Sequence, residues 1–193
     1  MRRLFFVILC YLMISQSAVA DDINSAEKMI KCTLDAVLCV LHNKDLTKHS
    51  KNSMLIEIIR PLFDFSRMAK LALGKRYWTR LSKAEQERFT ELFAKRLETS
   101  YCEKLMLYTD EKVIYETPVQ IKKRVHIPTY LASKDNKVSI LYKLYKTDKN
   151  WKIYDLEIQG VSIIRTYRSQ YSEIMQRGTF DDLMRKLEES IDS

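Results

Sequence analysis

The spacing of apolar residues changes twice along this 193-residue chain, and these changes limit what it can fold into. Between Phe89 and Tyr108 apolar residues recur about every 3.6 positions, as on one face of a helix. From Val113 to Ile158 they alternate with polar residues, as in strands, and after Gly160 the helical spacing returns. Because the strands form one block between helices, we expect an α+β domain with an antiparallel sheet.

Four strands are predicted in that block, joined by short polar turns. They cover residues 113–116, 125–131, 138–144 and 151–158. The turns fall at Lys134–Asn136 and Asp148–Asn150. Pro128 lacks an N–H group to donate, so it predicts an edge position or a bulge in the second strand. Short turns between successive strands indicate an antiparallel meander.

The predicted helices have recognisable ends. Pro61 suits the first position of a helix, and Gly74 suits its end. Ser82 and Glu85 form a capping box before the longest amphipathic run. Residues 43–53 are polar and indicate a loop or a weak helix. We expect helices over residues 23–42, 61–74, 83–108, 161–177 and 180–187.

The first twenty residues have the pattern of a secretory signal peptide. Arg2 and Arg3 precede an apolar run, Leu4 to Ile14, that is shorter than the roughly 20 residues needed to cross a bilayer. Ala18-Val19-Ala20 fits the small-x-small rule for cleavage, so we expect a signal peptide over residues 1–20 and one domain over 21–193. Cleavage lowers the formal charge from +8 to +6. In an exported protein this excess favours an anionic membrane or an acidic partner over nucleic acid.

Three cysteines remain after such cleavage. Cys32 and Cys39 lie seven residues apart on one predicted helix, about 10.5 Å along its axis, which is too far for a disulfide. One of them could pair with Cys102, or all three could be small buried residues. The apolar neighbours of Cys32 and Cys39 favour the second reading.

The residues that usually carry catalysis or bind metals do not form a known motif here. His42, His49 and His126 have no zinc-site spacing, and no serine lies in a nucleophile-elbow sequence. Asp64 and Asp155 are carboxylates with apolar neighbours, for which capping or structural hydrogen bonds are expected. We therefore expect no catalytic residue, no metal and no cofactor.

Basic residues gather in two stripes on the predicted strands. The first is Lys122-Lys123-Arg124, and the second contains Lys143, Lys146, Lys149 and Lys152. Such stripes are usually solvated strand faces, and docking to an acidic surface is the alternative.

Four segments together resemble one protein family. They are Pro61-Leu-Phe-Asp-Phe-Ser-Arg-Met-Ala-Lys-Leu-Ala-Leu-Gly74, residues 87–101, the Trp151-Lys-Ile-Tyr-Asp stretch with Gly160-Val-Ser through Tyr171, and residues 178–187. Their order after a signal peptide is similar to that in the MlaC family, also called toluene-tolerance or ABC-transporter auxiliary substrate-binding proteins. The resemblance covers nearly all of residues 21–193.

The resemblance implies a periplasmic phospholipid carrier with phospholipid as cargo. Its partners would be an outer-membrane lipoprotein–porin complex and an inner-membrane ABC transporter bearing an MCE-domain ring, and the carrier would be a monomer. The implied fold is a curved antiparallel four-stranded sheet of the nuclear-transport-factor-two-like or cystatin-like kind, backed by helices. The acyl chains would enter between sheet and helices, and the carrier would maintain the lipid asymmetry of the outer membrane.

Candidate lipid-binding residues follow from the expected inward positions of strands and helices. They are Val125, Ile127, Leu131, Val138, Ile140, Tyr142, Leu144, Ile153, Phe89, Phe93, Leu97, Val161 and Ile164. Two alternatives compete with the carrier. One is an enzyme on a cone-shaped, ketosteroid-isomerase-like fold with Asp155 or Asp64 as base. The other is a surface-adhesion module that binds through the basic stripes.

Overall fold

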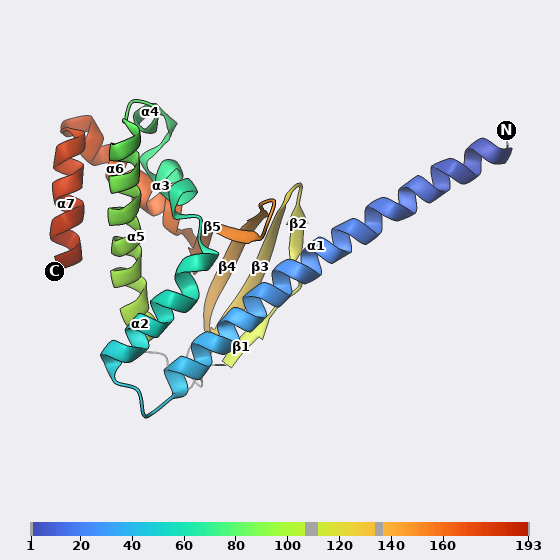
Figure 1. Cartoon of the computed structure of the whole chain (residues 1–193), viewed down its shortest axis with the longest axis horizontal. Coiled ribbons are helices and arrows are strands. Elements are labelled where there is room, and N and C mark those ends of the chain that lie inside the picture. Colours follow the sequence, from blue (N-terminus) through green and yellow to red (C-terminus); the bar gives the residue numbers. More distant parts are fainter. Residues whose placement is uncertain (1, 107–111, 134–136, 193) are drawn as a thin grey trace.

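The computed structural model describes residues 2–106, 112–133 and 137–192 (Figure 1). Within these ranges the helices are α1 (Arg2–His42), α2 (Lys48–Ile59), α3 (Phe65–Leu73), α4 (Lys75–Trp78), α5 (Lys83–Leu105), α6 (Ile163–Arg177) and α7 (Phe180–Asp192). A 3-10 turn, η1 (Arg60–Leu62), follows α2. The strands are β1 (Lys112–Tyr115), β2 (Val119–Ile121), β3 (Arg124–Ala132), β4 (Lys137–Lys146), β5 (Trp151–Ile158) and β6 (Val161–Ser162).

The strands form one antiparallel sheet in the order β1-β3-β4-β5-β6, with β2 also paired to β3. The α+β class and the antiparallel meander are therefore confirmed. Two short strands, β2 and β6, extend the four that the alternation predicts. Ile158 and Val161 pair across a two-residue turn in which Gln159 and Gly160 have φ values of 50° and 75°. That left-handed pair is typical of tight hairpins, and it makes the segment after Gly160 a strand before it becomes a helix.

Pro128 lies in β3, which has neighbours on both sides. On one side it faces β4, and on the other it faces the break between β1 and β2. The backbone N–H of Glu116 donates to the Pro128 carbonyl at this break. The missing N–H of Pro128 thus falls where one neighbouring strand stops and the next begins, which is a local edge inside the sheet.

The helix expected over 61–74 begins later, at Phe65. Phe63 is extended and bridges Ile153 of β5, and the Asp64 carboxylate accepts from the Arg67 N–H as an N-cap at 2.9 Å. Pro61 lies instead in η1. The capping box at Ser82 is present as predicted. The turn expected at Lys134–Asn136 lies outside the described residues.

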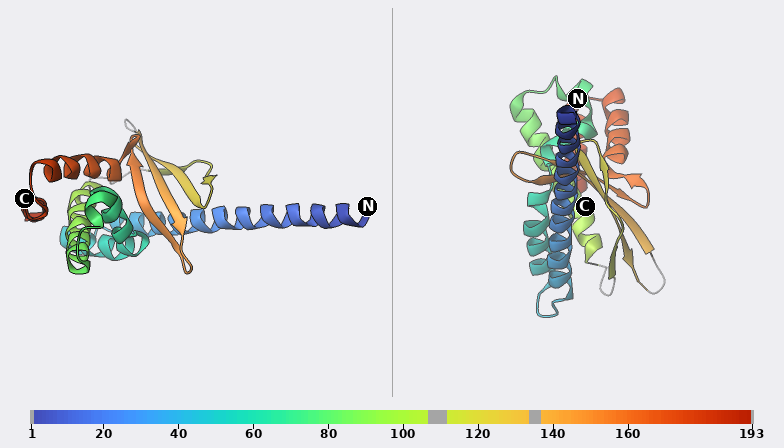
Figure 2. Two further views of the ribbon diagram at one scale, coloured as in Figure 1. Left: turned by 90° about the horizontal axis from the view of Figure 1, so that it is seen from above. Right: turned by 90° about the vertical axis from the view of Figure 1, so that its right-hand side faces the viewer.

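Helices cover the sheet in two ways (Figures 1 and 2). Helix α1 crosses the inner face of the sheet, with Ala26 and Ile30 buried against Val125, Leu144 and their neighbours. The other helices form a body beside the β5–β6 edge, joined to it by the bridge at Phe63. The N-terminal part of α1 projects away from the domain. Within the described residues, no helix combines the length and apolar character needed to cross a membrane.

The cysteines differ from expectation at two of three positions. Cys102 is buried, but Cys32 and Cys39 are exposed, and all three are free thiols. Each exposed cysteine follows a buried residue, Ile30 or Val37, by two positions. Two positions turn the side chain about 200° around a helix, so both cysteines lie on the outer side of α1.

Candidate functional site

A cavity of about 480 Å³ lies between α1, the sheet and the helical body. Its lining is overwhelmingly apolar. Helix α1 and the α2–α3 region supply Ile30, Thr33, Leu34, Val37, Ile59, Leu62, Phe63, Phe65 and Met68, and α5 supplies Leu97, Glu98, Tyr101, Cys102, Lys104 and Leu105. The sheet and α6 supply Leu131, Val138, Ile140, Tyr142, Ile153, Leu156, Ile158, Val161, Ile163 and Thr166. The volume is within the usual range for ligand sites.

A bulge in β5 turns apolar residues from both strand parities into this cavity. The pairing of β4 and β5 shifts between Lys143 and Leu144, which leaves Tyr154 as an extra residue. Ile153 lines the cavity before the bulge, and Leu156 and Ile158 line it afterwards. Strict alternation would have placed Leu156 and Ile158 on the opposite face from Ile153.

The rim of the cavity is marked by lining residues that are also exposed. These are Lys104 on α5, Val161 on β6 and Thr166 on α6. Val161 is 60% exposed, an unusual position for a large apolar side chain at the entrance to a cavity. The lining therefore reaches solvent at these three residues, whereas most of its other members are buried or half-buried.

Burial raises the pKa of four titratable groups in the cavity wall, which are Glu98, Tyr101, Cys102 and Tyr142. Glu98 accepts from Arg60 Nη1 at 2.6 Å, yet desolvation outweighs the pull of Arg60 and raises the pKa of the Glu98 carboxyl. Burial also raises the pKa of the Cys102 thiol to about 11, so the thiol stays protonated near neutral pH. A protonated, buried thiol is a small apolar wall element rather than a nucleophile.

Seven of the thirteen predicted lipid-binding residues line the cavity. They are Leu97, Leu131, Val138, Ile140, Tyr142, Ile153 and Val161. Val125, Ile127 and Leu144 lie instead beneath α1, in the cluster with Ala26 and Trp151. Phe89, Phe93 and Ile164 lie in the core of the helical body. Six predicted residues are therefore enclosed elsewhere, three under α1 at one end of the sheet and three inside the helical body.

Sequence reasoning missed the contribution of α1 and of the segment around Phe63. Ile30, Leu34 and Val37 form a regular apolar stripe, which identifies a helix face but not the surface that it meets. The spacing predicts one helix for Phe63 and Phe65, whereas Phe63 is extended and precedes the Asp64 cap and Phe65 begins α3. The bulge that admits Leu156 and Ile158 has a signal in the sequence, because apolar residues move from odd to even positions after Ile153.

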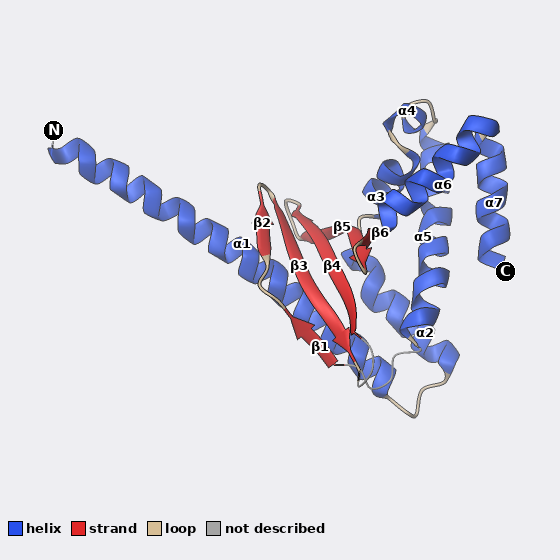
Figure 3. Cartoon of the chain, turned by 180° about the vertical axis from the view of Figure 1, so that it is seen from behind, coloured by secondary structure: helices blue, strands red, loops and turns tan. Residues whose placement is uncertain are grey.

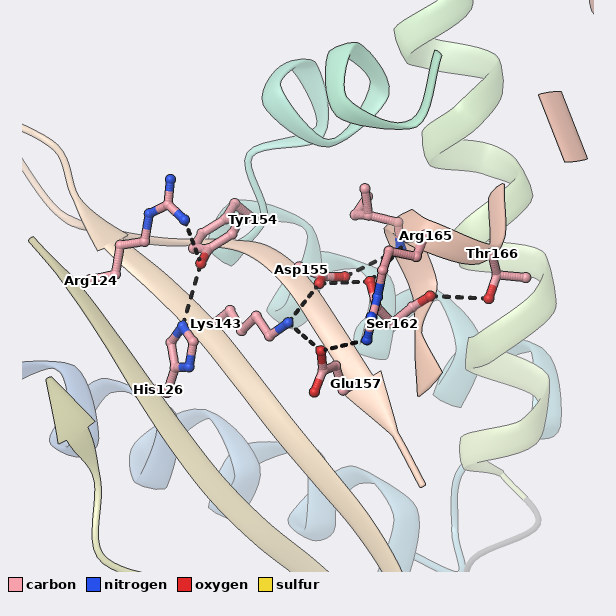
Figure 4. Close-up of polar contacts among 10 residues, drawn as sticks. Arg124, His126, Lys143, Tyr154, Asp155, Glu157, Ser162, Arg165 and Thr166 are labelled. Carbon is pink, nitrogen blue, oxygen red and sulfur yellow. Dashed lines mark hydrogen bonds and ion pairs between the residues drawn. The ribbon is translucent and has the colours of Figure 1, made fainter. Parts of the chain in front are cut away.

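Asp155, one of the two proposed bases, is held in a polar network (Figure 4) and is not among the cavity-lining residues. Its carboxylate accepts from Ser162 Oγ at 2.8 Å, from the Ile164 N–H at 3.2 Å and from Lys143 Nζ at 3.2 Å. Lys143 also pairs with Glu157, which pairs with Arg165. The network ties β4 and β5 to the start of α6.

Asp64 and His126 are likewise occupied in structural contacts. Asp64 caps α3 and accepts from the Tyr145 hydroxyl. Burial lowers the pKa of His126, and the positive charge of Lys143 lowers it further. His126 Nε2 lies 3.4 Å from the Tyr154 hydroxyl oxygen. Neither Asp64 nor His126 is among the cavity-lining residues. Across the described residues, no group of three or more His, Cys, Asp or Glu side chains could hold a metal ion.

Comparison with known proteins gives a consistent set of matches. The model of a family described as "MlaC protein" matches residues 31–189. The toluene tolerance protein ttg2D of Pseudomonas putida is 23% identical over 144 residues, covering 72% of this chain and 67% of that protein. The intermembrane phospholipid transport system binding protein MlaC of Haemophilus influenzae is 24% identical over 120 residues, covering 59% of this chain and 56% of that protein.

The fold is also found in a solved structure. It is a phospholipid-binding protein from Ralstonia solanacearum in complex with a phospholipid. The two structures superpose with a TM-score of 0.79 at 24% identity, covering 87% of this chain and 97% of the other.

Proposed function

Because this chain belongs to the MlaC family, we propose that it binds a phospholipid in the cavity and carries it between membranes. The observation that carries the proposal is the cavity itself, about 480 Å³ with an almost wholly apolar lining. Its wall joins three parts of the fold, so it depends on the complete domain. The phospholipid bound by the Ralstonia protein supports the same cargo class here.

The energetics of the cargo suit such a cavity. Filling an apolar volume of this size is worth on the order of 10 kcal/mol at about 24 cal/mol per Å³. A phospholipid has about 30 methylenes, and exposing both tails to water would cost on the order of 20 kcal/mol. Filling these 480 Å³ offsets about half of that cost, so the rest of the two tails needs further apolar contact, and the carrier unloads only where a partner offers an apolar path.

The rim defines the orientation of the bound lipid in this proposal. The tails enter past Val161 toward Ile140 and Leu97, where the walls are apolar. The headgroup stays near Lys104 and Thr166, where a charged and a hydroxyl side chain are exposed to water. Burying the headgroup instead would desolvate its charges without a matching set of polar partners.

We further propose the cellular setting that the family resemblance implies. The leader over residues 1–20 is removed after Ala20, and residues 21–193 work in the periplasm. There the carrier exchanges lipid with an outer-membrane lipoprotein–porin complex and with an inner-membrane ABC transporter that bears an MCE-domain ring. Binding and release of cargo, without covalent chemistry, are the proposed activity, and the structural roles of Asp155 and Asp64 support a carrier over an isomerase-like enzyme.

The test measures the lipid that co-purifies with the protein. Ile140→Arg and Val161→Arg each place a charge in the cavity or at its rim, and Ile114→Arg places the same charge on the exposed outer face of β1. Native mass spectrometry should show bound phospholipid in the wild type and in Ile114→Arg, and loss of most of it in the other two. Unchanged lipid content in both cavity variants, with their folds intact by circular dichroism, would rule out this cavity as the binding site.

A further inference from the structure

The two basic stripes of the sequence meet at one end of the sheet. Arg124 pairs with Tyr145, and Lys146 pairs with Trp151, so the β2–β3 turn and the β4–β5 turn lie side by side (Figure 3). The first turn presents Lys122, with φ of 59°, and Lys123. The second presents Lys149. We call this end, with Val119, Ile121–Arg124, Lys149 and Lys152, the basic end.

Most of this positive charge has no acidic partner. In the described part of the chain, the ion pair formed here joins Lys146 to Asp22 at 2.5 Å. Lys122, Lys123 and Lys149 are exposed, with Asp148 as the acidic residue of the second turn. Arg124 stacks over the Tyr154 ring, 4.9 Å from its centroid, so its charge is held at the surface rather than neutralised.

Exposed branched apolar residues lie next to these cations. Val119 is 52% exposed and Ile121 is 45% exposed, both on the short strand β2. Both pair with outer-face positions of β3, His126 and Arg124. Lysines next to exposed apolar residues suit the interface of an anionic bilayer, where cations meet headgroups and apolar groups enter below them.

Helix α1 connects this end to the predicted leader. Ser25 accepts from the Trp151 indole N–H at 2.9 Å, and Asp22 pairs with Lys146, so residues 22–25 lie at the basic end. The apolar residues 4–14 continue along the same helix away from the domain (Figure 1). The predicted leader therefore leaves the domain from the basic end.

We propose that the basic end docks on the surface of an anionic lipid bilayer. The sheet residues that line the cavity, such as Leu131, Val138 and Ile158, lie toward the opposite end of their strands. The docking contact therefore does not cover the cavity, and docking does not depend on bound cargo. An acidic protein could meet the charges alone, but a bilayer also accommodates Val119 and Ile121.

Cosedimentation with lipid vesicles tests this docking. The probe is phosphatidylcholine vesicles with or without phosphatidylglycerol, and the protein is the chain purified after export. Lys122→Glu/Lys123→Glu is compared with Lys75→Glu/Lys186→Glu, which changes the same charge at exposed positions on α4 and α7. We expect binding to the anionic vesicles only, weakening as salt rises. The first pair of substitutions should weaken it about 30-fold or more, as expected from the loss of two surface lysines, and the control pair much less.

Two further variants separate this docking from the cargo site. Ile121→Ser should weaken vesicle binding several-fold, and Ile140→Arg should leave it unchanged even though it empties the cavity of lipid. Equal vesicle binding by the two charge-reversal proteins would overturn the proposal. An absence of binding to anionic vesicles at low salt would also overturn the proposal. This includes the case in which the protein binds an acidic polypeptide but no vesicle.

Discussion

Two apolar regions of this domain contain similar residues but differ in how they are filled. Around α5 and α6, the rings of Phe93 and Tyr167 meet edge to face at 5.4 Å, and Tyr171 packs edge-on to Phe89 at 5.7 Å. Between α1, the sheet and the helical body, Ile140, Leu97 and their neighbours surround about 480 Å³ instead. The first region is a filled core, and the second is a cavity.

The difference arises from where each wall is anchored. Helices α5 and α6 belong to one helical body, and their aromatic side chains pack directly against each other. The cavity walls are held apart, because α1 is fixed over the far end of the sheet by Ala26 and Ile30 and β5 is fixed by its bridge to Phe63. Stability should therefore depend mainly on the first region, and lipid content mainly on the second.

The largest expected effect comes from truncating the filled core. Phe93→Ala removes a fully buried ring and should lower the free energy of unfolding by about 3–5 kcal/mol, with a fall in Tm of roughly 10 °C. Urea unfolding followed by circular dichroism measures this change. The fraction that remains folded should still contain lipid. A loss below about 1 kcal/mol would mean that the aromatic cluster is not the stabilising core.

Adding volume should lower stability in the filled core and lower lipid content in the cavity. Ala69→Leu overfills the fully buried core and should cost about 1–3 kcal/mol in the free energy of unfolding. Val138→Phe adds volume to the cavity wall, so the lipid-free protein should lose almost no stability while its lipid content falls. Thermal unfolding of delipidated protein and native mass spectrometry give the two readings. Equal destabilisation by both substitutions would contradict the distinction.

A smaller gain is expected from the Tyr171 hydroxyl. This residue is buried in the core, and its hydroxyl has no hydrogen-bond partner among the described residues. Burial also raises the pKa of Tyr171, which keeps the hydroxyl neutral. Tyr171→Phe removes an unsatisfied polar atom and should stabilise the protein by about 1 kcal/mol. Tyr77→Phe is the control at a half-buried site, and a loss of stability specific to Tyr171→Phe would reveal a partner for the hydroxyl.

The smallest expected effect is a pH-dependent change in stability caused by Glu98 in the cavity wall. Because burial raises the pKa of Glu98 in the folded state, the contribution of this group is fully favourable below its unfolded pKa and is lost as the pH rises through its folded pKa. Glu98→Gln should therefore be more stable than the wild type at neutral pH. The difference in their free energies of unfolding should shrink as the pH falls toward 4. Urea unfolding at a series of pH values measures it, with Glu188→Gln as a control that removes the exposed ion pair to Arg88. A gap that does not change with pH would contradict the assignment.

The change of hydrophobic spacing was enough to predict the fold class and most elements. It located β3, β4 and β5, the long helix α5 and its capping box, because each combines a regular pattern with a clear end signal. It missed β2 and β6, which have three and two residues, too few to show alternation. It began a helix at Pro61 rather than at Phe65, because the pairing of Phe63 with β5 depends on a contact far away in the sequence.

The candidate site was less predictable than the fold, for a specific reason. Periodicity shows that Ile127 and Ile140 face the same side of the sheet, but it does not show which part of that side α1 covers. The same limit applies to Phe93 and Leu97, which share a helix face while one lies in the core and the other lines the cavity. Tertiary packing decides between core and cavity, and the bulge at Tyr154 decides which β5 residues join the lining.

Locating the acyl chains directly is the strongest test of the central claim that the cavity holds the cargo. A phospholipid with brominated acyl chains can be loaded into the delipidated protein, and the bromine atoms can be located by anomalous scattering in crystals. The bromine signal should lie between Leu97 of α5 and Ile140 of β4, within the cavity lining. Bromine bound only elsewhere, such as on the outer face of the sheet near Ile114, would contradict the account.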